Sequence, residues 1–187
     1  MPHINTNPGE GDPTVSAFLF RRDSEGELRA LLHRHLKIGK LLQIGGHVDK
    51  HLNPWQAMAG ELDEEAGYDI DELQILQPIM RIPPKPNESI THPTPFSSNT
   101  HPFAGLDHFH SDWGYLFLAQ NEPSRPPHGR ESKELLWLSE VELHEIPDNE
   151  IPPNVRSIFD FGFKMMREIP DGWELVEASS FDCSMPD

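Results

Sequence analysis

Three glutamates that lie close together in the sequence are the residues best suited to chemistry. Glu61, Glu64 and Glu65 occupy positions i, i+3 and i+4 of a predicted helix, which places their carboxylates on one side of it. Three neighbouring carboxylates repel one another, and a hard divalent cation such as Mg²⁺ relieves that repulsion because it prefers oxygen ligands. The spacing therefore predicts a metal site, with a solvated acidic helix face as the alternative.

The helix that must position these carboxylates is predicted from Asn53 to Ala66. Asn53 is a suitable N-cap, and Pro54 fits the first helical position, where no amide hydrogen is needed. Gly67 is a natural C-terminal stop. Apolar residues recur on one side at the helical period, namely Trp55, Met58, Ala59, Leu62 and Ala66. The glutamates lie beside this stripe, so we expect them at the edge of the core.

The residues around this helix match a longer pattern. The run Gly46–Tyr68 resembles the Nudix box, which opens on Gly and closes on Arg-Glu-apolar-any-Glu-Glu-any-Gly-apolar. Gly46 matches the opening Gly, and Tyr68 stands at the last apolar position. The closing half is matched by Glu61, Leu62, Glu64, Glu65 and Gly67. The resemblance implies an α/β fold, a Nudix-type α/β/α sandwich with a mixed β-sheet.

The resemblance also implies an activity. Nudix enzymes hydrolyse a diphosphate linkage in a nucleoside diphosphate attached to another group. Metal ions held by the box glutamates neutralise the phosphates and position a water molecule, in keeping with the demands of phosphoryl chemistry. It implies Glu61, Glu64 and Glu65 as catalytic residues and metal ligands, with the Gly45 carbonyl as a further ligand. Glu61 is either a ligand or the general base. The expected cofactor is Mg²⁺, with Mn²⁺ as an alternative, and the expected partner is a small phosphorylated substrate.

Two charged positions of the box are absent from this chain. Leu52 stands in place of the first Glu, and Gly60 in place of the Arg. An Arg at position 60 would precede Glu64 by four residues and would face its carboxylate. Both losses can be linked, because a Glu and an Arg that pair can disappear together without leaving either charge alone. Lys50 is a candidate substitute cation. These changes favour a second hypothesis, a Nudix-fold ligand-binding module with weakened or absent catalysis.

Histidines outside the box supply further candidates for binding. His108, His110 and Asp112 alternate along a predicted strand, so they share one face of it. Such a face could bind a transition metal or contact a phosphate; for metal binding we favour the alternative, an ordinary polar strand face. We take His108 and His110 as candidates for substrate binding. We expect His47, in the glycine loop, to be structural rather than a ligand.

A basic segment before the box gives two more substrate-binding candidates. His33, Arg34 and His35 lie on another predicted strand and are all candidates for phosphate contact; we take Arg34 and His35 as substrate-binding residues. The alternative is an exposed basic strand. Trp113, Tyr115 and Phe117 could stack on a base, but we favour a place in the core.

The remaining elements give a mixed order of strands and helices, which favours an α/β sandwich over a series of βαβ units. We predict strands at 14–20, 28–35, 41–48, 73–82, 108–119 and 134–138, and helices at 53–66, 139–144 and 151–168. Residues 14–168 form a single domain, 1–13 a flexible lead-in and 169–187 a C-terminal tail. The long Pro-rich connection 83–107 is a functional or disordered loop in which Glu88 is a candidate extra metal ligand.

Composition limits the other classes of function. The chain has 187 residues and a net charge of -16, which argues against binding a nucleic acid polymer. A small phosphorylated ligand could still bind, because a bound divalent cation would reverse the negative electrostatic potential at its site. No apolar stretch approaches the roughly 18 residues of a membrane span, and residues 1–13 do not resemble a secretory signal. With a single cysteine, Cys183, we expect no internal disulfide. Together with the lack of a readable span or signal, this makes a cytoplasmic protein the expectation. The sequence leaves the oligomeric state open, a homodimer included.

Overall fold

The computed structural model describes residues 7, 9–82, 90–102, 107–129 and 134–181. Glu88 and Cys183 lie outside the described residues, as do parts of the segments 1–13, 83–107 and 169–187. None of the helices in the described ranges has the length and apolar character needed to cross a membrane.

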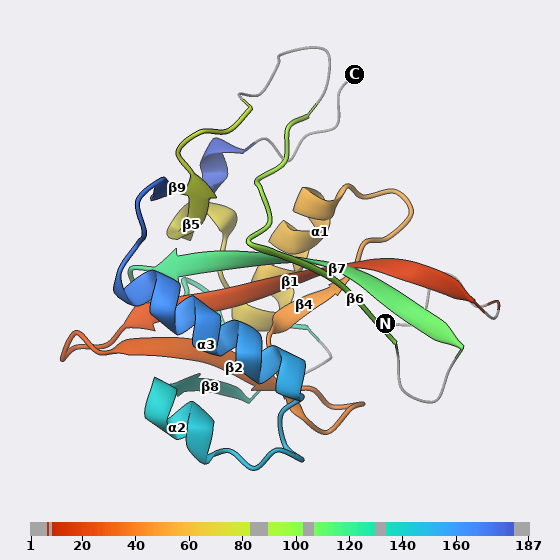
Figure 1. The fold of residues 1–187 in the computed structure, drawn as a ribbon, viewed down its shortest axis with the longest axis horizontal. Helices are drawn as coiled ribbons and strands as arrows, with labels where there is room; N and C mark the ends of the chain where they lie inside the picture. Colours follow the sequence, from red (N-terminus) through yellow and green to blue (C-terminus); the bar gives the residue numbers. More distant parts are fainter. Residues whose placement is uncertain (1–6, 8, 83–89, 103–106, 130–133, 182–187) are drawn as a thin grey trace.

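One mixed sheet forms the centre of the molecule (Figure 1). Its strands are β1 (Glu10–Arg22), β2 (Leu28–Arg34), β3 (Leu41–Leu42), β4 (Ile44–His47), β5 (Leu73–Pro78), β6 (Ser97–Pro102), β7 (His108–Ala119), β8 (Leu135–Leu138) and β9 (Trp173–Glu177). The main order is β3-β2-β1-β7-β5-β9, while β4 pairs with β1, β6 with β7 and β8 with β2. β1 runs parallel to β7 along the whole length of β7, and the other pairs are antiparallel.

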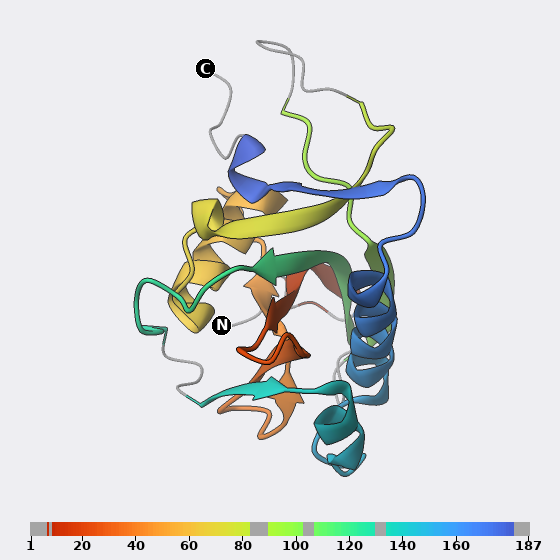
Figure 2. The ribbon, with the colours of Figure 1, turned by 90° about the vertical axis from the view of Figure 1, so that its left-hand side faces the viewer.

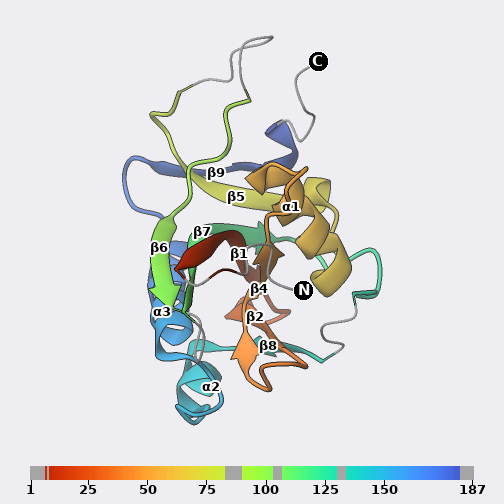
Figure 3. The ribbon, with the colours of Figure 1, turned by 90° about the vertical axis from the view of Figure 1, so that its right-hand side faces the viewer.

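Helices cover both faces of this sheet (Figures 2 and 3). Helix α1 (Pro54–Glu61) lies on one face, and α3 (Pro153–Arg167) lies on the other, beside the short α2 (Glu140–Glu145). β1 contributes to both apolar layers because its side chains alternate: Val15 packs in the layer of α1, and Phe18 in that of α3. The predicted α/β/α sandwich is confirmed.

The helix of the glutamates begins as predicted and ends differently. The Asn53 side chain accepts a hydrogen bond from the Gln56 amide, and Pro54 opens the helix. After Glu61 the chain continues as a π-helical turn, Leu62–Ala66, and Gly67 caps it in the left-handed conformation. A π turn widens the helix locally, and such turns occur frequently at functional sites. Short 3₁₀ turns follow at Ile70–Glu72 and, later, at Ala178–Ser180.

Three segments predicted to be irregular contain strands. β1 begins at Glu10 instead of Thr14, since its first residues pair with the start of β7. β6 lies inside the predicted loop 83–107 and pairs with β7. β9 lies inside the predicted tail 169–187 and pairs with β5. In all three the partner strand, rather than local propensity, supplies the backbone hydrogen bonds.

Candidate active site

Glu65 holds the box helix against the glycine loop. Its side chain is buried, and its Oε2 accepts a hydrogen bond of 3.1 Å from the Gly45 amide. Nδ1 of His33, on β2, lies 3.8 Å from Oε1 of the same carboxylate. The π turn, β4 and β2 therefore meet at one carboxylate.

Gly45 is required at this meeting point by its backbone. It has a φ of 149°, a conformation that residues with a side chain rarely adopt. A Cβ there would stand 2.2 Å from the Val15 carbonyl oxygen on β1. The close approach of β4 to β1 thus fixes the position of the Gly45 amide, which donates the hydrogen bond to Glu65.

Glu61 and Glu64 have different surroundings. Glu61 is 7% exposed and lines a cavity beside the glycine loop. Glu64 is exposed, and its carbonyl oxygen accepts hydrogen bonds from the amides of His128 and Gly129. We expected all three carboxylates on one side of a regular helix; in the structure Glu61 and Glu65 are buried, while Glu64 reaches solvent. The π turn that interrupts the α-helix between Glu61 and Glu65 is the physical reason.

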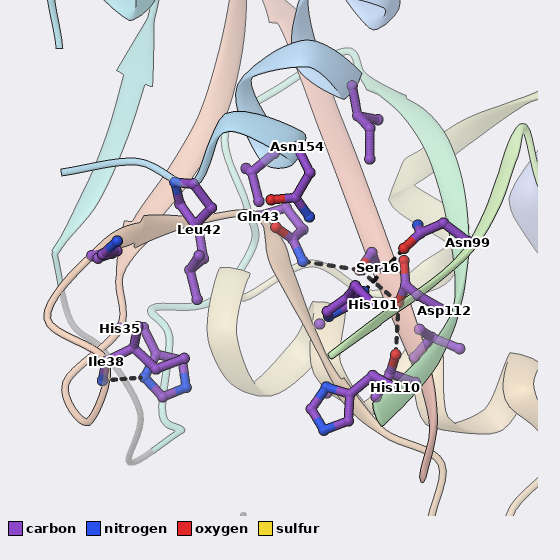
Figure 4. A pocket seen from close by; sticks show the side chains of 18 of the residues that line it. Ser16, His35, Ile38, Leu42, Gln43, Asn99, His101, His110, Asp112 and Asn154 are labelled. Atoms are coloured by element: carbon purple, nitrogen blue, oxygen red, sulfur yellow. Dashed lines mark hydrogen bonds between the residues drawn. The ribbon is translucent and has the colours of Figure 1, made fainter. Parts of the chain in front are cut away.

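A cavity of about 480 Å³ opens beside the glycine loop. One part is lined by apolar side chains, among them Leu42, Val155 and Ile158. The other part is polar and includes Glu61 and His110. Figure 4 shows His35 and Ile38 on one side of it and Asn99, His101, His110 and Asp112 on the other. The volume and the mixture of surfaces suit a ligand of nucleotide size.

Hydrogen bonds order the polar wall of this cavity. Oδ1 of Asp112, on β7, accepts hydrogen bonds of 2.9 Å from the hydroxyls of Thr14 and Ser16 on β1. The Gln43 side-chain amide donates to the Ser16 hydroxyl in turn (Figure 4). Burial raises the pKa of Asp112 above its ordinary value, although the two hydroxyls and the nearby His101 oppose that shift.

The substrate-binding candidates have separate positions. His35 and His110 line the cavity. His108 is buried on the same strand face as His110, and its Nε2 lies 3.3 Å from Oδ2 of Asp12. Arg34 points to the opposite side of the strand from His33 and His35. It forms ion pairs with Glu150 and Glu134 and is not one of the residues that line the cavity. The structure thus brings two of the four candidates into the cavity.

Several residues at the site had no signal in the sequence that identified them. Asp12 lies in a stretch that reads as a flexible lead-in, and it is fully buried beside His108. His101 lies in the polar strand β6, and its Nδ1 is 3.0 Å from Oδ1 of Asn99. His33, by contrast, was a candidate for phosphate contact from the sequence, and it is buried beside Glu65.

The family was tested by comparison with known proteins. Residues 12–160 match the model of the NUDIX domain. The chain belongs to the Nudix family. The family and the fold support hydrolase activity in this Nudix chain. A comparison with curated protein sequences gave no match.

Solved structures similar to this Nudix chain include a NUDIX-family hydrolase from Clostridium perfringens, with 24% identity and a TM-score of 0.62 over 86% of this chain and 99% of that one. A C. elegans Ap4A hydrolase, solved as a binary complex, has 17% identity and a TM-score of 0.60 over 83% and 97%. The NUDIX domain of Shewanella oneidensis NrtR, solved with ADP ribose, has 14% identity and a TM-score of 0.57 over 84% and 88%. At these identities the likeness establishes the shared fold.

The two missing charges of the Nudix box leave distinct surroundings. Leu52 is partly buried and packs against the apolar layer of α1, so an apolar contact replaces the Glu. Gly60 is exposed, and a Cβ at that position would meet no atom within 4 Å. Lys50 is exposed as well. Arg125 does lie near the box, but it forms its ion pairs with Asp63 and Asp69.

Proposed function

We propose that this chain is a metal-dependent hydrolase that cleaves a diphosphate linkage in a nucleoside diphosphate joined to another group, or in a related small phosphorylated compound. The observation that supports this best is the buried Glu65 carboxylate, fixed on the Gly45 amide, with Glu61 at the wall of the adjacent cavity. Both are box glutamates; Glu61 lines the cavity itself, and Glu65 is bonded to Gly45, which lines it as well.

The residues at this place fit a hard divalent cation. Glu61, Glu65 and the Gly45 carbonyl offer oxygen donors, which Mg²⁺ and Mn²⁺ prefer. Exposed Glu64 would have to reach the ion from the solvent side. When bound, such an ion supplies neutralisation of phosphate charge and activation of water. We propose Mg²⁺, with Mn²⁺ as the alternative.

The cavity supplies the contacts for a phosphorylated substrate. Lys37, Lys40 and His35 lie along it, in a chain whose net charge is -16. Cationic and imidazole groups attract and orient phosphates locally even where the whole molecule is acidic. The apolar part near Leu42 and Val155 fits a base or another flat apolar group. We place the phosphates at the glycine loop and the remaining group toward α3.

The names of the similar structures agree with this class of substrate. One is an Ap4A hydrolase, and another holds ADP ribose. Both compounds are small nucleotides that contain a phosphate–phosphate linkage. We therefore propose dinucleotides and nucleoside diphosphate sugars as the first substrates to test.

A Nudix-fold binding module without efficient catalysis is the second candidate, and Leu52 and Gly60 favour it. Position 60 has no cation to face Glu64, and no charged residue stands at position 52. This module would retain the cavity and bind the same ligands without turnover. Titration calorimetry with the compounds of the substrate screen separates it from the enzyme, because binding without hydrolysis supports the module alone.

Replacement of Glu65 tests the proposed activity. We expect hydrolysis that requires Mg²⁺ or Mn²⁺ for at least one dinucleotide or nucleoside diphosphate sugar. Glu65→Gln removes the charge while keeping the shape, so activity should fall by about 100-fold or more. The measurement is release of the phosphorylated products, with and without the metal.

Glu145→Gln is the matched control, since Glu145 is an exposed residue at the end of α2. It should leave the rate unchanged. Equal rates for the wild type and Glu65→Gln, or no turnover of any compound by the wild type, would overturn the enzymatic proposal.

A further inference from the structure

We propose that Asp12, His47 and His110 form a second metal site, which binds a transition-metal ion of the Zn²⁺ type and is separate from the box glutamates. The three residues come from β1, β4 and β7, three strands that are adjacent in the sheet. Their donor atoms all lie within 4.8 Å of one another. Among the described residues, this is the group of three or more His, Cys, Asp or Glu side chains whose donor atoms lie this close together. The box glutamates do not meet that criterion.

The sheet register brings the three side chains to one face. Asp12 is the direct partner of His110 across the parallel pair β1–β7, and His47 is the partner of Thr14 across β1–β4. Thr14 follows Asp12 by two residues, so the side chains of Asp12 and His47 share a face. The imidazole rings of His47 and His110 are 5.0 Å apart, and those of His108 and His110 are 5.3 Å apart. Backbone pairing, and not a mobile loop, therefore positions the donors.

The separation between two of the donors agrees with tetrahedral coordination. Nε2 of His47 lies 3.5 Å from Oδ2 of Asp12. Zinc bonds of about 2.0–2.1 Å at tetrahedral angles separate two ligand atoms by about 3.4 Å. The donor atom of His110 lies within 4.8 Å of the other two, close enough to share one ion with them.

Burial adds a reason for a cation here. The Asp12 side chain is 0% exposed, and His110 is 8% exposed. A buried carboxylate costs free energy unless positive charge lies beside it. One divalent ion beside Asp12 supplies that charge, and neutral imidazoles can serve as its other ligands.

The donor set decides the class of ion. Two imidazole nitrogens and one carboxylate oxygen suit Zn²⁺, whereas Mg²⁺ prefers oxygen donors alone. We assign His108 as a positioning residue that acts through Asp12, because carboxylate ligands are commonly held by a second polar group. His47 and His110 also line the cavity beside the glycine loop, so the ion would lie in its wall. Asp112, which shares the strand face of His108 and His110, lies outside this trio and is bonded to Thr14 and Ser16.

Metal analysis of the untagged protein tests this site. After removal of metals with a chelator, we expect the wild type to bind one Zn²⁺ per chain at this site and to gain about 5 °C or more in Tm. Co²⁺ in its place should show the visible absorption of a tetrahedral complex. His47→Ala and His110→Ala should abolish both signals, and His108→Ala should weaken binding by about 10–100-fold.

Two controls separate this site from the rest of the cavity. Glu65→Gln alters the carboxylate site, and His35→Ala removes a cavity imidazole outside the proposed trio; both should retain the Zn²⁺ and the Co²⁺ absorption. Absence of a bound ion in the wild type, or retention of it in His110→Ala, would overturn the proposal. If His110→Ala does not fold, X-ray absorption of the Zn²⁺-loaded wild type decides. Nitrogen donors at about 2.0–2.1 Å support the site, and a shell of oxygen alone rejects it.

Discussion

At the scale of single residues, the box gives the position of Glu65 but not its environment. The resemblance implies all three of Glu61, Glu64 and Glu65 as site residues, whereas the structure buries two of them and exposes one. The hydrogen bond between Gly45 and Glu65 joins residues 20 positions apart, so helical spacing alone does not predict it. The burial of Asp12 beside His108 depends on pairing with a strand almost 100 residues later, which no local pattern reports.

Gly45→Ala tests the contact between β4 and β1. The added Cβ would stand 2.2 Å from a backbone oxygen at a φ that disfavours any side chain, so we expect a loss of about 1–3 kcal/mol in the free energy of unfolding. Displacement of the Gly45 amide should also lower hydrolytic activity, because Glu65 then loses its donor. Urea unfolding and the hydrolysis rate provide the two measurements.

Gly26→Ala is the matched control for this substitution. Gly26 also has a positive φ, 82°, but a Cβ there would meet no atom within 4 Å, and it does not line the cavity. It should cost about 1–2 kcal/mol of stability and leave the activity unchanged. If Gly45→Ala is as active as Gly26→Ala, the Gly45 amide does not position Glu65.

At the scale of elements, the sequence predicted those with a strong period or a clear cap. β7 has the predicted bounds, and Ser139 caps α2 through the Glu142 amide. Tyr115 and Phe117 are buried with the α1 layer, as expected. β6 and β9 escaped prediction because β6 is polar, β9 is short, and both depend on a partner strand. The π turn after Glu61 also escaped, since its residues fit an α-helical pattern equally well.

Two helical glycines should respond to Ala with opposite signs. Gly60 faces open space on α1, so Gly60→Ala should raise the free energy of unfolding by up to about 1 kcal/mol through helix propensity. Gly162 is a buried residue of α3 that faces β1, and a Cβ there would stand 2.8 Å from Cζ of Phe20. Gly162→Ala should therefore lower that free energy by about 1–3 kcal/mol. The midpoints of urea unfolding compare both variants with the wild type.

Gly60→Arg extends this comparison to the missing charge of the box. Gly60→Ala controls for helix propensity, so any difference in hydrolysis rate between the two variants reports the cation facing Glu64. A higher rate for the Arg variant means that the lost charge limits catalysis. Destabilisation by Gly60→Ala would contradict the exposed position of this residue.

At the scale of the whole molecule, two apolar layers enclose the sheet, and both tyrosines belong to the layer of α1. Burial raises the pKa of Tyr115 to about 12 and raises that of Tyr68 further, from an ordinary value of 10.0. The Tyr68 hydroxyl also donates a hydrogen bond of 2.8 Å to the Asn121 carbonyl. A phenol whose pKa is raised by folding favours the folded state while it remains neutral.

The raised pKa values of the two tyrosines predict that the folded state loses stability at high pH. The contribution of the tyrosines is fully present below pH 10.0, the ordinary pKa, and is lost as the pH rises toward about 12. Phenolate absorbance and circular dichroism should therefore change together within that window. Tyr68→Phe should remove about half of the absorbance change, since the chain has 2 tyrosines. Phenolate that appears near pH 10 with an unchanged dichroism spectrum would contradict the buried state.

The parallel pairing of β1 with β7 has a consequence for the order of folding. Thr14 and Asp112, bonded across this pair, are 98 residues apart in the chain. Closure of such a long loop costs entropy before its contacts are gained, so non-local pairing of this kind is slow. During synthesis β1 lacks its central neighbour until β7 has emerged. The polar wall of the cavity is therefore a late product of folding, and its donors can meet an ion or a substrate only once the sheet is complete.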